Sequence, residues 1–509
     1  MTAEDSPVEM PQGRDGENLR SHAARGVFWT ATGNWGEQLA ALFVFSILSR
    51  LLEPEAFGLV ALASVFVGFT QLFADQGLAD ALVQRKQLDS AHLDSAFWMS
   101  IGFGVLLAAV LAALAVPIGT VLGQEQLAPV LVALSLAIPI SSSSLVQRAI
   151  LTRDMAFQSL TLRTLTATAV GGVFGVSAAL LGFGVWSLVA QNFALQITGA
   201  IVLWRVTQWR PRFNVSYAHF RDLFGFGIHV VGFRLLNYWN RNADNFFIGS
   251  FLGPVSLGFY AVAFRMLRLL TQVTISLIDR VAFPLYSRLQ DDPDRLRRAY
   301  YKSSSFAALV TLPAFIGSLV MAPEIVSVLF GSKWAASVPV MQVLTLVGII
   351  RAFTYLNSSV LMARGKPSWR VAIAGATAVL SAIGFLLAVR HGIVAVAIAA
   401  VCIGFLVAPI SYSAVNRLVP IDPRTYLKRI TGPLVGSVLL TGVIVGLRHL
   451  LDNANTLVTL IVVSSAGVLV YAAAIWIFSR PLADEARDLA RRALPTLGFP
   501  RANRLFTRR

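Results

Sequence analysis

The sequence predicts an all-helical membrane protein that crosses the bilayer about fourteen times. Of its 509 residues, 56% are hydrophobic and only 13% are charged, whereas charged residues make up about a quarter of an ordinary globular domain. The hydrophobic residues gather in long stretches, and about 20 of them suffice for a helix to span the hydrocarbon core. A transmembrane barrel would instead show alternating segments of about ten residues. The chain is therefore expected to be polytopic and helical.

Short polar loops separate the apolar stretches and set the limits of the expected helices. The ranges are 26–49, 57–82, 94–117, 127–147, 160–181, 183–204, 223–251, 255–279, 303–322, 338–362, 371–389, 392–415, 431–449 and 456–478. We group them into an N-terminal lobe (26–204), a linker (205–222), a C-terminal lobe (223–415) and two additional helices (431–478), with tails at 1–25 and 479–509.

An internal repeat supports the division into two lobes. Residues 50–63 read RLLEPEAFGLVALA, and residues 250–263 read SFLGPVSLGFYAVA. Five residues recur at an offset of 200, namely Leu52, Pro54, Gly58, Ala61 and Ala63 as Leu252, Pro254, Gly258, Ala261 and Ala263. Each copy joins the first two helices of a six-helix half. Halves with an even number of helices run parallel, so an axis along the membrane normal should relate them. Two similar but unrelated turns are the alternative.

Lysine and arginine are concentrated on one side of the expected bundle. The net charge of +16 would suggest nucleic acid in a soluble chain, but no water-exposed domain is expected here to carry a basic face. About 33 of the 42 basic residues fall on the side of the two termini, and about four fall opposite. The positive-inside rule then places both termini in the cytoplasm. The basic segment 482–494 either forms an amphipathic helix on anionic membrane lipids or stays solvated.

Residues typical of enzymes are sparse. Cys402 is the only cysteine, which excludes disulfides and cysteine-rich metal centres. The six histidines are scattered without an HExxH sequence, and there is no Walker A sequence, so zinc-dependent or ATP hydrolysis is not expected. The longest expected loop opposite the termini, about 15 residues around 323–337, is too short for a catalytic domain. We expect no catalytic residue, no metal and no bound cofactor.

Charged residues inside the expected helices are the strongest candidates for a binding site, because ionisable groups facing lipid are costly. The candidates share one face of helix 223–251 (Arg234, Asn237, Arg241, Asp244) and one face of helix 255–279 (Arg265, Arg268, Gln272), with Arg351 in helix 338–362. The single acid cannot neutralise the arginines, so an anion is expected. A guanidinium binds phosphate bidentately, which predicts a phosphate or pyrophosphate receptor. The alternative is that Arg241 pairs with Asp244 and Arg268 reaches the interface.

Carboxylates in the first half are candidates for ion coupling. Glu37 and Asp75 lie inside expected helices, and a buried carboxylate can take up a proton or a cation. Together with Asp244, they predict coupling to a Na⁺ or H⁺ gradient, with the membrane potential as a further energy source. Asp80 lies within a turn of a helix end, where an ordinary cap or loop contact is expected.

Two segments resemble a known family. EAFGLVALASVFVGFTQLFADQGLADALVQRK at 55–86 and RNADNFFIGSFLGPVSLGFYAVAFRMLRLL at 241–270 are similar to the signature regions of the polysaccharide transporter family. Its members are oligosaccharide flippases (Wzx-like) of the multidrug/oligosaccharidyl-lipid/polysaccharide flippase superfamily. The likeness in helix number, repeat and termini extends over roughly residues 20–480.

This resemblance implies a fold and a function. The fold has two six-helix lobes around a central V-shaped cavity, followed by two further helices. The function is translocation of oligosaccharide repeat units on undecaprenyl pyrophosphate across the bacterial inner membrane, for exopolysaccharide, capsule or O-antigen synthesis. A polysaccharide polymerase and export machinery are the implied partners. Cavity arginines of related flippases hold pyrophosphate, a role that here would fall to Arg234, Arg241, Arg265 and Arg268.

Two other transporter classes remain open. A peptidoglycan lipid-precursor flippase would need the same phosphate chemistry. A multidrug exporter of the same superfamily would share the architecture, but it usually needs an acidic or aromatic cavity for cationic drugs. A glycan polymerase or ligase would present a long outer loop with catalytic residues, which this sequence lacks.

Overall fold

The computed structural model describes residues 35–75, 77–85, 89–213, 217–451, 454–484 and 487, with the backbone alone at 217–231, 273 and 275–284. The tail 1–25, the start of the first expected helix and most of the segments 479–509 and 482–494 lie outside the described residues. Within the described ranges the chain is helical and contains no strand. The all-helical prediction is confirmed.

The N-terminal half begins with helical residues 35–51. It continues through α2 (Pro54–Asp75), α3 (Leu78–Gln84), α4 (Ser90–Val121), α5 (Leu127–Ser135), α6 (Ala137–Ser142), α7 (Leu145–Arg153), α8 (Phe157–Leu180) and α9 (Val185–Val206).

The C-terminal half begins with α10 (Tyr217–Arg288), which is two helices joined at Gly253. Gly253 has a left-handed backbone (φ 80°), and it lies where the sequence predicts the limit between two helices. The rest of the half consists of α11 (Pro293–Val320), α12 (Ala322–Leu329), η1 (Ser332–Trp334), α13 (Ser337–Ala363), α14 (Pro367–Ala388), η2 (Val389–His391), α15 (Ile393–Asn416), α16 (Pro423–Leu450) and α17 (Thr456–Phe478).

Eleven of the described helices are long and apolar enough to cross a membrane, or twelve if the bent pair 127–142 and 145–153 forms one span. The first helix begins at the edge of the described residues, and α10 enters this set as one helix, 232–272. The total of fourteen spans therefore stays a prediction, as do the limits of the two lobes.

Two helices begin earlier than hydropathy predicts. α11 starts at Pro293 rather than near residue 303, and α16 starts at Pro423 rather than near residue 431. An aspartate caps each start: Asp292 accepts a hydrogen bond from the backbone of Arg295, and Asp422 accepts them from the backbone of Arg424 and Thr425. The bonds from the Thr425 hydroxyl and backbone N–H lower the pKa of Asp422. Proline at the first helical position completes this signal.

Two expected helices are interrupted. The range 57–82 is divided into α2 and α3, and Gly77 before α3 has a left-handed backbone (φ 68°). The range 127–147 becomes α5, α6 and α7, continues to Arg153 and bends by 43° before Leu145. At the bend, the Ser143 and Ser144 hydroxyls donate to carbonyls three residues earlier. Such bonds compete with the helical pattern.

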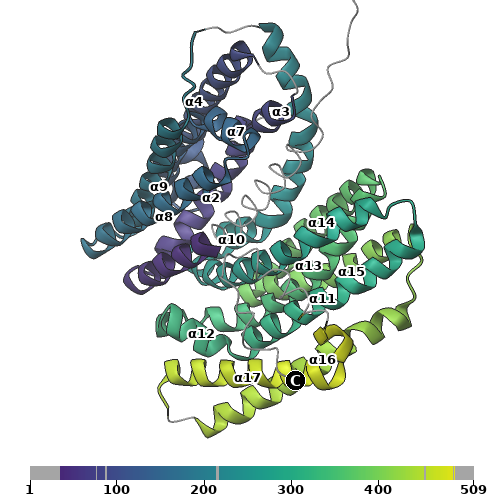
Figure 1. Cartoon of the computed structure of the whole chain (residues 1–509). Coiled ribbons are helices and arrows are strands. Elements are labelled where there is room, and N and C mark those ends of the chain that lie inside the picture. Colours follow the sequence, from purple (N-terminus) through teal and green to yellow (C-terminus); the bar gives the residue numbers. More distant parts are fainter. Residues whose placement is uncertain are drawn as a thin grey trace, which may run out of the picture.

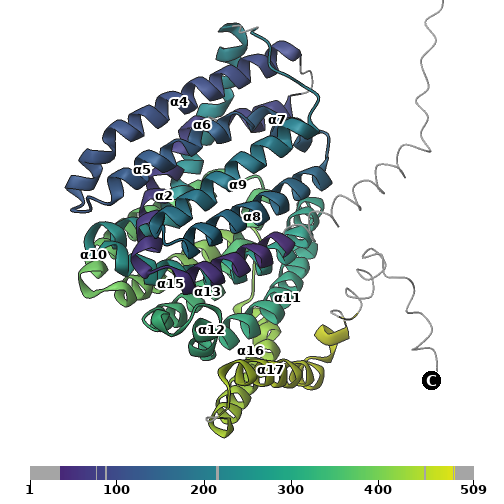
Figure 2. The same ribbon diagram turned by 90° about the vertical axis from the view of Figure 1, so that its left-hand side faces the viewer.

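Figure 1 shows α2 to α9 as one group of helices and α11 to α15 as another, with α10 reaching between them. In Figure 2, α8 and α9 lie side by side within the first group. α16 packs on α11 of the second group, and α17 packs on α12 and α16. The most extensive contact of the first group with the rest of the chain is that of α2 with α10.

The two copies of the sequence repeat meet at this contact. Gly58 packs on the carbonyl of Pro254, and Gly258 packs on the carbonyl of Pro54, so closely that a Cβ on either glycine would overlap the facing backbone. All four residues are buried. A contact in which each copy uses the same residues on the other is the pattern that twofold symmetry produces. The repeat therefore positions the two lobes.

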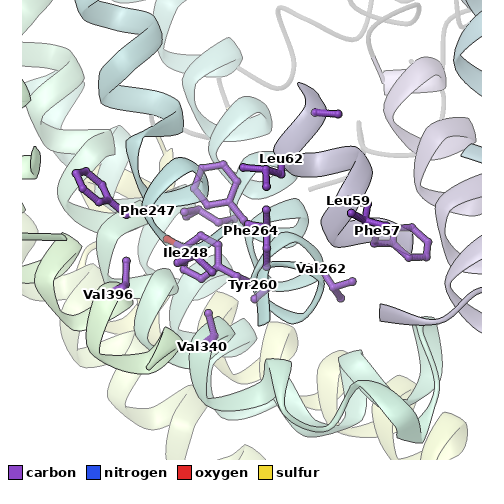
Figure 3. Close-up of a cluster of buried hydrophobic side chains, with 14 of the residues drawn as sticks. Phe57, Leu59, Leu62, Phe247, Ile248, Tyr260, Val262, Phe264, Val340 and Val396 are labelled. Atoms are coloured by element: carbon purple, nitrogen blue, oxygen red, sulfur yellow. The ribbon is translucent and has the colours of Figure 1, made fainter. Parts of the chain in front are cut away.

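A hydrophobic core continues from this junction. Figure 3 shows Leu59 and Leu62 of α2 in one buried cluster with Ile248, Tyr260 and Phe264 of α10. Farther along, the Tyr238 hydroxyl donates to the carbonyl of Val65 (2.7 Å). Together with the Gly58 contact, these pairs show that α2 runs antiparallel to the first part of α10.

We predict that Gly58→Ala and Gly258→Ala each lower the free energy of unfolding by about 1–3 kcal/mol, the usual cost of overpacking. The added methyl group must push one backbone away from the other. Thermal unfolding in detergent measures the effect, with Gly375→Ala as control because a Cβ there meets nothing within 4 Å. The double variant should lower the free energy of unfolding by less than the sum of the two single variants, because one separation of the backbones relieves both overlaps. Stability equal to that of the control would contradict the reciprocal contact.

Candidate functional site

Asp244, in α10, is the most buried of the candidate carboxylates, with 6% of its surface exposed. The Tyr260 hydroxyl donates a hydrogen bond to Oδ2 (2.8 Å), and the backbone N–H of Asn245 donates one to Oδ1 (2.8 Å). Arg268 and Arg351 interact with this carboxylate electrostatically. Among the described residues, none forms an ion pair with Asp244. Asp244 thus links the two helices of α10 through Tyr260.

Arg265 and Arg268, in the second helix of α10, lie against aromatic rings. The Arg265 guanidinium is 5.5 Å from the ring centre of Phe45, and that of Arg268 is 5.2 Å from the ring centre of Phe264. A cation–π contact holds a guanidinium without cancelling its charge. Neither arginine forms an ion pair with a residue that the structure describes.

Arg234 forms an ion pair with Asp80. Arg234 belongs to α10 and Asp80 to α3, so this pair joins the C-terminal lobe to the N-terminal lobe. The expectation that Asp80 makes an ordinary cap or loop contact is wrong, because α3 packs on α10 and Asp80 pairs there with Arg234. Arg234 is therefore not a free receptor for an anion in this structure.

The remaining candidates differ in exposure. Arg241 and Gln272 are exposed, whereas Arg351 is partly buried in α13. Arg241 does not pair with Asp244, since no described ion pair joins them. The Asn237 amide donates to the carbonyl of Phe233 (2.8 Å), a bond within its own helix. The roles of these residues stay predictions.

The candidate carboxylates of the N-terminal lobe interact with arginines of both lobes. Glu37, in the first helix, interacts electrostatically with Arg163 of α8 and with Arg265 of α10. Asp75, at the end of α2, accepts a hydrogen bond from Gln71 (3.4 Å) and interacts with Arg148 and Arg234.

Arg148 and Arg163 were missed as candidates by the sequence reasoning. Hydropathy placed Arg148 in a loop and Arg163 in the first turn of the expected helix 160–181, on the side counted with the termini. In the structure α7 contains Arg148 and α8 contains Arg163, each partly buried. The expected helix 160–181 was the available signal for Arg163, since it already enclosed that residue.

The charged residues form one continuous set of electrostatic interactions across both lobes. Its arginines are Arg148, Arg163, Arg234, Arg241, Arg265, Arg268 and Arg351, and its carboxylates are Glu37, Asp75, Asp80 and Asp244. Seven arginines against four carboxylates leave three positive charges uncancelled. A formal surplus of this kind is suited to an anion, and anion binding at these residues stays a prediction.

Comparison with known proteins decides the family. The family model described as polysaccharide biosynthesis protein matches residues 47–339, more than half of the chain. The chain belongs to this family. The match includes Asp80, Arg234, Asp244, Arg265 and Arg268, and it leaves out Glu37 and Arg351.

Curated relatives of this family member are transport and biosynthesis proteins for polysaccharides. The succinoglycan biosynthesis transport protein ExoT of Rhizobium meliloti is 29% identical over 483 residues, covering 92% of this chain and 96% of that protein. The lipopolysaccharide biosynthesis protein WzxC of Escherichia coli is 27% identical over 363 residues, covering 69% of this chain and 71% of that protein.

Solved structures support the fold of this family member. The lipid II flippase MurJ, in an inward closed conformation, matches with a TM-score of 0.71 over 89% of this chain and 99% of that one, at 14% identity. At this identity the likeness concerns the fold alone.

Among the residues that the structure describes, no group of three or more His, Cys, Asp or Glu side chains could hold a metal ion.

We predict that Asp80→Asn and Arg234→Gln separate the lobes at the α3 end while changing the free energy of unfolding by at most about 1 kcal/mol, as expected for a partly exposed pair. The exchange Asp80→Arg with Arg234→Asp should restore the contact. Spin labels at Gln84 and Ser368, in a chain with Cys402→Ser, would report longer distances in the single variants. Unchanged distances would show that the ion pair does not hold the lobes.

Proposed function

We propose that this protein is a flippase for oligosaccharide repeat units linked to undecaprenyl pyrophosphate. It moves them from the cytoplasmic to the outer leaflet of the bacterial inner membrane for exopolysaccharide, capsule or O-antigen biosynthesis. The observation that carries the proposal is the uncancelled positive charge of arginines placed on two facing lobes. Family membership and the relatives named for succinoglycan transport and lipopolysaccharide biosynthesis support the substrate class.

The physical problem that such a protein solves is desolvation. Moving an ion from water into a medium of low dielectric constant costs on the order of 20 kcal/mol by an idealised Born estimate. Arg265, Arg268 and Arg351 offer charged donors that replace water around the pyrophosphate. The glycan would pass through a water-filled space between the lobes, while the polyprenyl chain remains in lipid.

Transport would proceed by alternating access. The two lobes would rock against each other about the arginine site, so that the end with the Asp80–Arg234 pair and the end with the repeat contact open in turn to the two sides of the membrane. We place both termini in the cytoplasm, because about 33 of the 42 basic residues lie on their side. The Asp80–Arg234 pair then closes the cytoplasmic side.

Glu37, Asp75 and Asp244 are the proposed coupling residues for a H⁺ or Na⁺ gradient. Glu37 fits this role well, because it interacts with an arginine of each lobe. Neutralising it by a proton would free Arg163 and Arg265 for a substrate anion. The membrane potential is the alternative energy source. A polysaccharide polymerase and the export machinery are the proposed partners that receive the product.

Reconstituted vesicles can test the substrate class. We expect flux of an undecaprenyl-pyrophosphate oligosaccharide and none of a lipophilic cationic drug. Flux of a peptidoglycan lipid precursor at the same or a higher rate would favour the peptidoglycan alternative, and flux of the drug alone would overturn the proposal.

We predict that changing Arg241, Arg265, Arg268 and Arg351 together to Gln lowers flux of the lipid-linked glycan at least about 100-fold, because hydrogen bonds to charged groups contribute about 1.5–3 kcal/mol each. The matched control removes four arginines whose side chains are exposed outside this set, Arg205, Arg390, Arg417 and Arg424, and should stay within about twofold of wild type. Equal flux in the two quadruple variants would refute the arginine receptor.

A further inference from the structure

Arg148 and Arg163 form a cationic pair in the N-terminal lobe, apart from the arginines of α10 and α13. They lie on α7 and α8, two helices that contact each other, and the charge of Arg148 acts on Arg163. Neither forms an ion pair with a described residue. Two like charges held together inside a protein are unfavourable unless an anion lies between them.

The Arg163 guanidinium packs on Gly199 of α9, and we call this packing position the seat of Arg163. A Cβ on Gly199 would come within 2.9 Å of both Nε and Nη2 of Arg163. Gly199 is buried. The Nε atom of Arg163 is itself buried and has no hydrogen-bond partner among the described residues. A buried donor without an acceptor is costly, so the seat is suited to a ligand that supplies an oxygen.

The nearby carboxylates do not satisfy this pair. Glu37 is shared between Arg163 and Arg265, and Asp75 is shared between Arg148 and Arg234. The whole set of interactions keeps three uncancelled positive charges. A pyrophosphate diester carries about two negative charges at neutral pH, since phosphate groups lose their first proton well below neutrality. One positive charge is then left over.

We propose that Arg148 and Arg163 form a second oxyanion site, which binds the carboxylate of an acidic sugar in the transported repeat unit. This inference rests on the proposed function, because it assigns the pyrophosphate to Arg265, Arg268 and Arg351. A sugar carboxylate supplies one negative charge and two acceptor oxygens, which match the remaining charge and the free Nε donor. The protein therefore selects acidic over neutral repeat units.

Two lipids that differ in one group test this selection. One is an undecaprenyl-pyrophosphate oligosaccharide that contains a single uronic acid, and the other is its carboxyl-reduced counterpart. For Arg148→Gln and Arg163→Gln in reconstituted vesicles, we expect flux of the acidic lipid to fall about tenfold and flux of the neutral lipid to change less than twofold. Arg163→Lys should retain part of the selection, because it keeps the charge.

Gly199→Ala tests the seat without removing charge. Its methyl group displaces the Arg163 guanidinium, so it should also reduce flux of the acidic lipid selectively. The controls are Gly102→Ala, where a Cβ meets nothing within 4 Å, and Arg205→Gln, an exposed arginine at the end of α9. Both should behave as wild type with either lipid.

Each outcome separates this inference from the proposed function. An equal loss of flux with both lipids in the arginine variants would overturn the sugar site and assign Arg148 and Arg163 to the pyrophosphate. Unchanged flux with both lipids would overturn the second site altogether. If wild type moves neither lipid, the proposed function fails. Binding of the free uronic acid oligosaccharide to purified wild type, against Arg163→Gln and against the carboxyl-reduced oligosaccharide, then decides the site on its own.

Discussion

The close approach of two backbones at the repeat is the constraint on which the arrangement of the protein depends. Gly58 and Gly258 allow α2 and α10 to touch where any other residue would hold them apart. Without water to drive helix association, membrane proteins depend on such tight van der Waals packing. Because each glycine meets the proline of the other copy, a single sequence motif used twice fixes the relative position of the lobes and so of their charged faces.

The charged residues of the set lie on both lobes. Glu37 of the first lobe interacts with Arg265 of the second, and Asp80 of the first pairs with Arg234 of the second. Carboxylates thus act across the boundary, while six of the seven arginines in the set, all but Arg234, form no ion pair with a described residue. We therefore expect the position of the lobes to depend on occupancy of the site, because any anion or proton that alters a charge also alters the attraction between the lobes.

Sequence reasoning identified the all-helical class and most helix limits to within a few residues, and it placed the candidate arginines on α10 and α13, because hydropathy and helical spacing are local properties. It misplaced the starts of α11 and α16 because hydropathy does not register helices that extend beyond the membrane, although the Asp-Pro caps at Asp292 and Asp422 were visible. Sequence reasoning did not identify which residues contact each other. The pairing of Arg234 with Asp80 and the seat of Arg163 on Gly199 join residues far apart in the chain, and only tertiary packing brings them together.

The two ends of the lobe boundary differ in strength. At the end with the repeat, backbone packing is joined by hydrogen bonds from Lys333 to the carbonyl of Leu52 (2.7 Å) and from Trp334 to that of Ser49 (2.9 Å). About 30 Å away, at 1.5 Å per residue along α10, the described residues contribute one partly exposed ion pair, Asp80 with Arg234, and such pairs contribute at most about 1 kcal/mol. Within the proposed alternating access, we therefore expect the Asp80 end to open at little cost, and we expect a bound anion to supply the energy for opening the repeat end by favouring the opened state.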